Sequence, residues 1–147
     1  MNSTRQGAVS IRPALESDTE SLCSLDEIAA ESPERREFVR HSATDGTCYV
    51  AVIDQEAVGY IVLSYAFYHH GCIDMLYVAR DYRRRGVGSA LLEQVERLCK
   101  TQKLFTSTNL SNSSMQALLS RRGYVHSGVI HNLDEGDPEV VYFKRLR

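Results

Sequence analysis

The sequence has 147 residues, of which 43% are hydrophobic and 24% are charged, and its net charge is −2 at pH 7. This composition is typical of one globular domain that buries a core without disulfides or metal. The lack of a basic surplus argues against binding to nucleic acid or to acidic membranes. No apolar stretch has the length of a membrane-spanning helix or the form of a secretory signal. We therefore expect a cytoplasmic, single-domain protein over residues 1–147 that binds small molecules, with residues 1–7 as a candidate for disorder.

The N-terminal part of the chain predicts a strand and a helix. Apolar and polar residues alternate over residues 8–12, which indicates a strand with one buried face. Ser17 and Glu20 have the spacing of a capping box, and apolar residues then recur at helical spacing. The first helix should therefore run to about Ala30.

A second helix and a hairpin follow. Ser32 before Pro33 predicts a helix N-terminus, and this helical segment should end near Gly46. Residues 47–53 and 57–65 are rich in β-branched and aromatic residues and are separated by a polar turn. This arrangement is typical of an antiparallel hairpin.

The central part predicts a strand, a helix and a strand. Residues 72–78 are nearly all apolar, as expected for a strand covered on both faces, and Asp74 is the exception. Residues 104–108 predict the next strand, and this order suggests a parallel pair joined by a crossover. The helix between them should begin at about Gly86 and carry one apolar stripe, formed by Val87, Leu91, Val95, Leu98 and Cys99.

The C-terminal part predicts a last helix and two strands. Apolar residues over 115–119 mark the helix, which Gly123 should close, and the strands cover residues 124–130 and 139–144. The elements together indicate an α/β fold with a mixed, mostly antiparallel seven-stranded sheet and about four helices.

Residues 83–88, with the sequence RRRGVG, form a candidate anion site between the apolar strand and the amphipathic helix. Backbone N–H groups and the positive end of the helix meet there, and Gly86 and Gly88 allow the backbone to approach a phosphate closely. The alternative is a glycine-containing turn with solvated arginines, because short glycine motifs often match by chance. A P-loop does not fit, because GK[ST] is missing, and Leu91 occupies the third glycine position of a dinucleotide fingerprint.

Two stretches carry a resemblance to a known family. LYVARDYRRRGVGSALLEQV resembles the acetyl-CoA-binding signature of the GNAT superfamily of N-acetyltransferases, and NSSMQALLSRRGY is similar to a second signature of that superfamily. The resemblance covers nearly the whole chain and implies a GNAT-like sheet that is splayed between strands four and five to hold acetyl-CoA. It also implies acetyl transfer to a primary amine of a small molecule or peptide by direct attack in a ternary complex, without a metal. Homodimers are common among such proteins.

The resemblance also assigns roles to individual residues. It implies that backbone groups of residues 76–78 pair with the pantetheine arm, that amides of residues 84–89 hold the pyrophosphate, and that Asn112 bonds the arm near its thiol end. The implied cofactor-binding residues are Leu76, Tyr77, Val78, Arg83, Arg84, Arg85, Gly86, Val87, Gly88, Ser89 and Asn112.

Two positions depart from the family pattern. Leu119 stands where the family often has the tyrosine that protonates the leaving thiolate, and Ser107 stands near the glutamate base of relatives that acetylate a ribosomal protein. These departures motivate an alternative, a non-catalytic acyl-CoA-binding or regulatory module with the same fold.

Other polar residues offer further candidates. Asp74 is the candidate general base, because a partly buried carboxylate with a raised pKa suits an ammonium substrate. The alternative is a carboxylate at an exposed or hydrogen-bonded position of the strand. An acidic loop, formed by Asp134, Glu135, Asp137 and Glu139, either recognises a cationic acceptor or is an acidic solvated turn. The five histidines and four cysteines show no metal-ligand spacing, so we expect surface histidines and free buried thiols.

Overall fold

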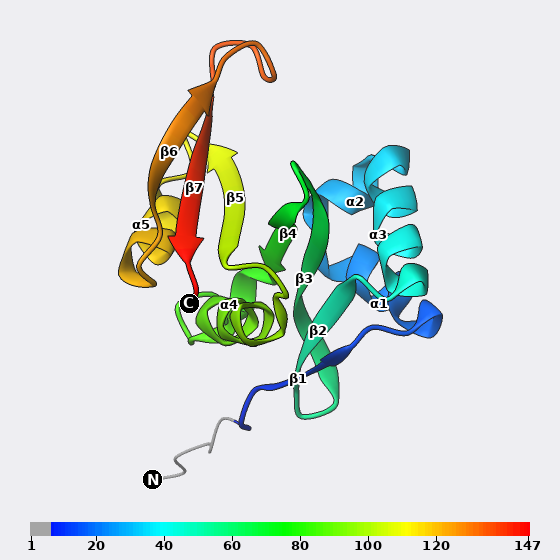
Figure 1. Ribbon diagram of the computed structural model, residues 1–147. Coiled ribbons are helices and arrows are strands. Elements are labelled where there is room, and N and C mark those ends of the chain that lie inside the picture. Colours follow the sequence, from blue (N-terminus) through cyan, green and yellow to red (C-terminus); the bar gives the residue numbers. More distant parts are fainter. Residues whose placement is uncertain (1–6) are drawn as a thin grey trace, which may run out of the picture. The chain divides into compact units, whose positions relative to one another are not determined.

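The computed structural model describes residues 7–147. The predicted disorder of residues 1–6 therefore concerns residues outside the described range. A seven-stranded sheet and five α-helices are present in the described range (Figure 1). The strands are β1 (Ser10–Pro13), β2 (Cys48–Ile53), β3 (Glu56–Phe67), β4 (His70–Val78), β5 (Lys103–Asn109), β6 (Val125–Ile130) and β7 (Glu139–Arg145). The helices are α1 (Thr19–Leu25), α2 (Glu27–Glu31), α3 (Pro33–Asp45), α4 (Val87–Leu98) and α5 (Ser113–Arg121), with short 3₁₀ turns at Glu16–Asp18 and Arg80–Tyr82.

The sheet confirms the predicted fold class. Its strand order is β1-β2-β3-β4-β5-β7-β6, and the pairs β1–β2, β2–β3, β5–β7 and β6–β7 are antiparallel. β4 and β5 are parallel, as expected for two strands joined through a helix. Their ladder comprises three pairs, from Gly71–Leu104 to Ile73–Thr106, whereas β4 continues to Val78 and β5 to Asn109. The two strands thus pair over only part of their length, in an open sheet.

The chain divides into two compact units, and the expectation of one domain stays a prediction. Among the described residues, unit 1 contains residues 7–62 together with Met75–Gln94, and unit 2 contains Leu63–Asp74 and Val95–Arg147.

In unit 1, the prediction of one long first helix is wrong. Asp26 has extended backbone angles, φ −90° and ψ 103°, and separates α1 from α2. Its carboxylate accepts hydrogen bonds from the amides of Ile28 and Ala29, so it caps α2. The predicted capping box is also absent, because the N-cap of α1 is Asp18, whose carboxylate bonds Arg12 instead.

The predicted boundaries of α3 are confirmed. The Ser32 hydroxyl accepts a hydrogen bond from the Arg35 amide, Pro33 opens the helix, and Gly46 ends it with φ +83°. A left-handed residue at this position is the usual role of glycine after a helix. The three helices pack together beside β2 and β3 (Figure 1) around a core that includes Leu22, Cys23, Ala29, Val39, Cys48, Val50, Tyr60 and Val62.

In unit 2, the predicted helix and strands are confirmed, and α5 lies against one face of the sheet. Tyr142 of β7 donates to Gln116 of α5, and Leu119 of α5 is buried, with 1% of its surface exposed. Gly123 follows α5 with φ +89°, as predicted.

Strand β4 is less covered than the sequence suggested. Gly71 and Ile73 are buried, but its other residues are half-buried or, in the case of Asp74, exposed. Three of the four cysteines are buried, Cys72 is half-buried, and all four are free thiols. No helix within residues 7–147 is long and apolar enough to cross a membrane.

Candidate functional site

The loop before α4 has the geometry of an anion site. Gly86 accepts the first helical hydrogen bond, from the Ala90 amide, so the amides of residues 87–89 belong to the first turn and lack acceptors within the helix. Two residues of the loop are left-handed, Arg84 with φ +62° and Gly86 with φ +82°. Glycine is favoured at such a position because it has no Cβ. Donors at the positive end of a helix can therefore bind a phosphate here.

The three arginines of this loop are exposed, but two of them are anchored. The Nε of Arg83 donates to the carbonyl of Val78 at 3.0 Å, and its guanidinium lies 5.4 Å from the centre of the Tyr77 ring. The guanidinium of Arg85 lies 5.4 Å from the Tyr82 ring. Arg83 thus connects the loop to β4, and the loop as a whole presents positive charge where the family resemblance predicts the pyrophosphate.

The cofactor strand predicted at residues 76–78 is half-buried, and part of its backbone is occupied. The Val78 carbonyl accepts from Arg83, so it is already paired. The carbonyl of Tyr77 faces Gly59 of β3, where a Cβ would lie only 2.9 Å from that oxygen. A Cβ on Gly59 would also lie 3.3 Å from Val87 and 3.4 Å from Leu91, so the missing side chain allows α4 to pack closely on β3.

The Tyr77 side chain is held by the helices of unit 1. Its hydroxyl accepts a hydrogen bond from the Glu27 amide at 3.3 Å, and its ring stacks on Tyr60 with a centroid distance of 6.4 Å. Glu27 is the first residue of α2, directly after Asp26. The cap of α2 therefore also positions a residue of the expected cofactor strand.

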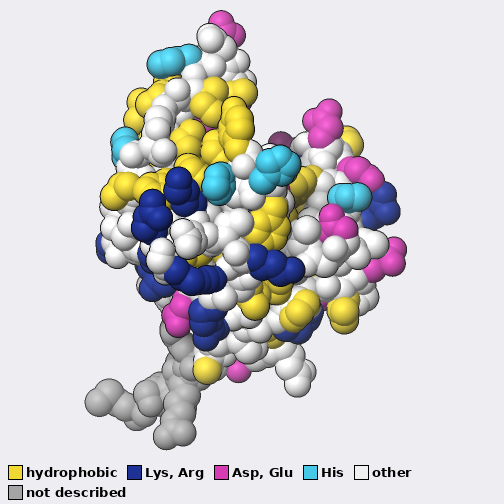
Figure 2. Space-filling view, viewed as in Figure 1, with side chains coloured by type: hydrophobic (Ala, Val, Ile, Leu, Met, Phe, Trp, Pro, Cys, Tyr) yellow, Lys and Arg dark blue, Asp and Glu magenta, His cyan; other side chains and the backbone are white. Residues whose placement is uncertain are grey.

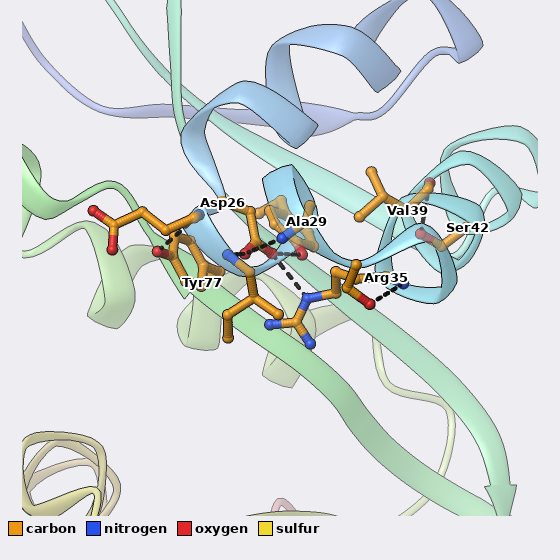
Figure 3. A network of polar contacts seen from close by, with 10 residues as sticks. Asp26, Ala29, Arg35, Val39, Ser42 and Tyr77 are labelled. Atoms are coloured by element: carbon orange, nitrogen blue, oxygen red, sulfur yellow. Dashed lines mark hydrogen bonds and ion pairs between the residues drawn. The ribbon is translucent and has the colours of Figure 1, made fainter.

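Asp26 is the centre of a polar network in unit 1 (Figure 3). It is fully buried, and its two carboxylate oxygens have separate tasks. Oδ1 accepts from the amides of Ile28 and Ala29, whereas Oδ2 accepts from the Tyr60 hydroxyl at 2.6 Å and from Arg35 Nε at 3.0 Å. These four donors satisfy a charge that would otherwise be costly to bury.

Asn112, the N-cap of α5, and Leu119, within α5, both belong to unit 2. Asn112 is exposed and caps the helix, because its Oδ1 accepts from the Met115 amide at 3.2 Å. This cap uses only the side-chain oxygen of Asn112, so the predicted hydrogen bond to the pantetheine arm would have to come from its Nδ2 group. Leu119 is a core residue, and it cannot supply a proton to a leaving thiolate.

Asp74, the predicted general base, is exposed rather than partly buried, so that part of the prediction is wrong. It lies one residue beyond the end of the β4–β5 ladder. Burial and the adjacent charge and hydrogen bond of Asp74 raise the pKa of the Cys72 thiol to about 12. Because Cys72 and Asp74 are two residues apart on one strand, their side chains lie on the same face of β4.

The acidic loop is partly engaged in its own structure. Asp137 accepts hydrogen bonds from the amide and the hydroxyl of Ser111, at 3.0 and 2.6 Å, and Asp134 accepts from Asn109 Nδ2 at 2.8 Å. These contacts fix the loop to the end of β5. Two of its carboxylates thus already have partners, which weakens the argument for recognition of a cationic acceptor.

The sequence did not reveal three important residues. Asp26 and Gly59 lay inside stretches with regular periodicity, and Cys72 was considered only as a free thiol. The one local signal for Asp26 was a carboxylate three residues before Ala29, which is the spacing of a helix cap. No group of three or more potential metal ligands lies close enough together for a metal site within residues 7–147.

The chain is similar to acetyltransferases in sequence and in structure. Residues 12–124 match the acetyltransferase (GNAT) family. A streptothricin acetyltransferase from Escherichia coli is 28% identical over 103 residues, which are 67% of this chain but only 59% of that protein.

Two solved structures are similar to the whole fold or to most of it. A GNAT-family acetyltransferase from Bacillus cereus ATCC 10987 has a TM-score of 0.88 and 32% identity over 95% of this chain and 98% of its own. A structure described as a streptothricin acetyltransferase from Bacillus anthracis, in complex with acetyl coenzyme A, has a TM-score of 0.62 and 20% identity over 67% of this chain and 61% of its own.

Proposed function

The chain belongs to the acetyltransferase (GNAT) family, and on this premise we propose that it transfers an acetyl group from acetyl-CoA to a primary amine. The observation that carries the proposal is the loop before α4, where acceptor-free amides, two left-handed residues and three arginines meet in one short segment. In this assignment the amides of residues 84–89 bind the pyrophosphate, and the backbone of Leu76 and Val78 pairs with the pantetheine arm. Arg83 must then release the Val78 carbonyl or share it with the cofactor.

The reaction is a direct attack in a ternary complex. The neutral amine nitrogen attacks the thioester carbonyl carbon, a C–N bond forms, and the C–S bond breaks, so that the electron pair leaves with the sulfur of coenzyme A. Asp74, directly or through a water, takes the ammonium proton before the attack, and the second N–H proton leaves the adduct to solvent or to the departing thiolate. Asn112 Nδ2 donates to the arm near the thiol. No metal is required.

The base matters more than a general acid in this scheme. An ammonium with a pKa near 10.4 lies ~3.4 units above pH 7, so presenting the free amine costs ~4.6 kcal/mol. A leaving thiol with a pKa near 8.5 lies only ~1.5 units above pH 7, and its departure as thiolate forfeits ~2 kcal/mol. The replacement of the usual tyrosine by Leu119 is therefore tolerable, whereas the loss of a base is not.

Streptothricin is the first acceptor to test, because one relative in sequence and one structural neighbour are described as streptothricin acetyltransferases. Small amines and peptide N-termini form the rest of the panel. The cytoplasmic location and a homodimer stay predictions.

A turnover assay tests the proposal. Release of coenzyme A is measured over the amine panel, together with the rise in melting temperature that acetyl-CoA produces. Asp74→Asn should lower kcat by ~10²-fold near pH 7 and by much less at high pH, where the amine is already neutral. Glu93→Gln, an exposed carboxylate on α4, is the matched control and should keep wild-type kcat. Wild-type kcat in Asp74→Asn at pH 7 would place the base elsewhere, and cofactor binding without turnover of any amine would favour the non-catalytic acyl-CoA-binding module.

A further inference from the structure

Unit 2 exposes a cluster of aromatic rings, which we call the aromatic face: Phe67, His70, Phe105 and Phe143. Phe105 lies at its centre, with its ring centroid 4.9 Å from Phe67, 5.8 Å from His70 and 5.6 Å from Phe143. All four side chains are half-buried. Hydrophobic side chains are visible over β5, β6 and β7 in the space-filling view (Figure 2).

The aromatic face points away from the helices of unit 2. Tyr142 and Lys144, the neighbours of Phe143 in β7, bond Gln116 of α5 and Glu96 of α4. Successive side chains of a strand point to opposite faces of a sheet. Phe143 and its neighbour Phe105 therefore lie on the face that is opposite α5 and the end of α4.

The strand register extends this face in both directions. Phe105 is paired with Phe143, and Phe143 with Val125, whose surface is 54% exposed. On the other side, Phe105 is paired with Cys72 of β4. One row of apolar side chains therefore crosses β4, β5, β7 and β6.

A carboxylate lies beside this row. Asp74 lies two residues after Cys72 on β4, so its side chain shares the face with Cys72 and the aromatic rings, and it follows the last residue pair of the β4–β5 ladder. Two residues along a strand correspond to about 6.6 Å, and neighbouring strands lie about 4.8 Å apart. The position of Asp74 is thus about 8 Å from that of Phe105 and about 12 Å from that of Phe143, distances that an amine with a short alkyl chain and a ring can span.

We propose that the aromatic face binds the non-reacting part of the acceptor, and that the acceptor is a small primary amine carrying an aryl or branched alkyl group. The ammonium pairs with Asp74, and the apolar group lies on Phe105 and Phe143. This inference rests on the proposed function, in which Asp74 is the base. Charge complementarity and the apolar row favour such a monoamine over a diamine, because Asp134 and Asp137 of the acidic loop already hold other partners.

The test compares three amines of graded character: 4-phenylbutylamine, ethylamine and 1,4-diaminobutane. We expect kcat/KM for 4-phenylbutylamine to exceed both others by about 10-fold or more, since a ring that is partly removed from water gains a corresponding free energy. Phe143→Ala should reduce this preference about 10-fold, and Phe143→Leu, which keeps most of the apolar volume and the fold, should reduce it less. Val129→Ala is the control, because Val129 is 51% exposed on the same strand pair but is paired with Val140, on the opposite face.

Calorimetry and sedimentation separate the possible failures. Equal kcat/KM for the phenyl and ethyl amines would overturn the inference and leave the proposed function intact. Binding of 4-phenylbutylamine that depends on Phe143, without turnover of any amine, would support the aromatic face and refute the acetyl transfer. A dimer that Phe143→Ala dissociates would assign the face to a second copy of the chain and overturn the inference.

Discussion

Replacement of Asp26 by alanine should strongly destabilise unit 1. The substitution removes an acceptor from two helix amides, from the buried Tyr60 hydroxyl and from Arg35, whose side chain is only 18% exposed. A lost helix cap costs about 1 kcal/mol, and a buried donor without a partner costs about 1–3 kcal/mol. Because Arg35 also loses its ion-pair partner, we expect the free energy of unfolding to fall by about 4 kcal/mol, within the range for broken buried ion pairs. For a chain of 147 residues that corresponds to a fall in Tm of roughly 13 °C.

The two oxygens of Asp26 allow this cost to be divided. Asp26→Asn keeps Oδ1 for the amides of Ile28 and Ala29 but replaces Oδ2 by a donor, which faces the Nε–H of Arg35. We therefore expect Asp26→Asn to lose about 2–3 kcal/mol, with the cap retained. The free energy of unfolding of Asp26→Asn should therefore lie between those of wild type and Asp26→Ala.

Ser32→Ala is the matched control, because Ser32 caps the adjacent helix α3 with one hydrogen bond and is not part of a buried ion pair. Its expected cost is about 1 kcal/mol. Thermal and urea unfolding, followed by circular dichroism, measure all three variants. If Asp26→Ala is no more destabilised than Ser32→Ala, the buried network contributes nothing beyond a cap, and the reasoning is wrong.

Two further predictions concern the candidate site. Asn112→Ser keeps a capping oxygen but lacks Nδ2, so the free energy of unfolding should stay within about 0.5 kcal/mol of wild type while KM for acetyl-CoA rises about 5-fold. Asn112→Ala should show the same rise in KM and also lose about 1 kcal/mol of stability. A wild-type KM in both variants would show that Asn112 is only a cap. With a pKa of about 12, Cys72 is ionised to about one part in 10⁴ at pH 8, so its labelling by a disulfide reagent should be slow and rise about 10-fold per pH unit. Because Asp74 raises this pKa, Asp74→Asn should lower the pKa of Cys72 and speed its labelling at pH 8, and Cys72→Ser identifies the signal. An unchanged rate would contradict the influence of Asp74 on the Cys72 thiol.

Local signals in the sequence predicted the elements and most of their ends. Ser32 and Pro33 start α3 and Gly46 ends it, because capping depends on residues within one helical turn. The glycine-containing loop before α4 was predicted for the same reason, since a left-handed position and the first amides of a helix are local features.

The break at Asp26 could not be predicted from periodicity. Its partner Tyr60 is 34 residues away and Arg35 is 9 residues away, so the stabilisation of a buried carboxylate becomes apparent only when these segments meet. The exposure of Asp74 was missed for a related reason. An apolar run predicts a covered strand, but β4 pairs with β5 over three residues only, and its other residues stay half-buried or exposed.

The sequence by itself determined the order of the elements, the glycine-containing loop before α4 and the family, because these depend on periodicity, caps and short motifs. Only the tertiary structure decided which polar groups are free to act. In the structure, Asp134 and Asp137 accept hydrogen bonds from Asn109 of β5 and from Ser111 just after it, whereas Asp74 is exposed. The strand register places Cys72, Phe105 and Phe143 in one row, on the face of the sheet that also carries Asp74. The physical reason is that hydrogen bonding, burial and strand register join residues that are distant in the chain, and no local pattern encodes those pairings.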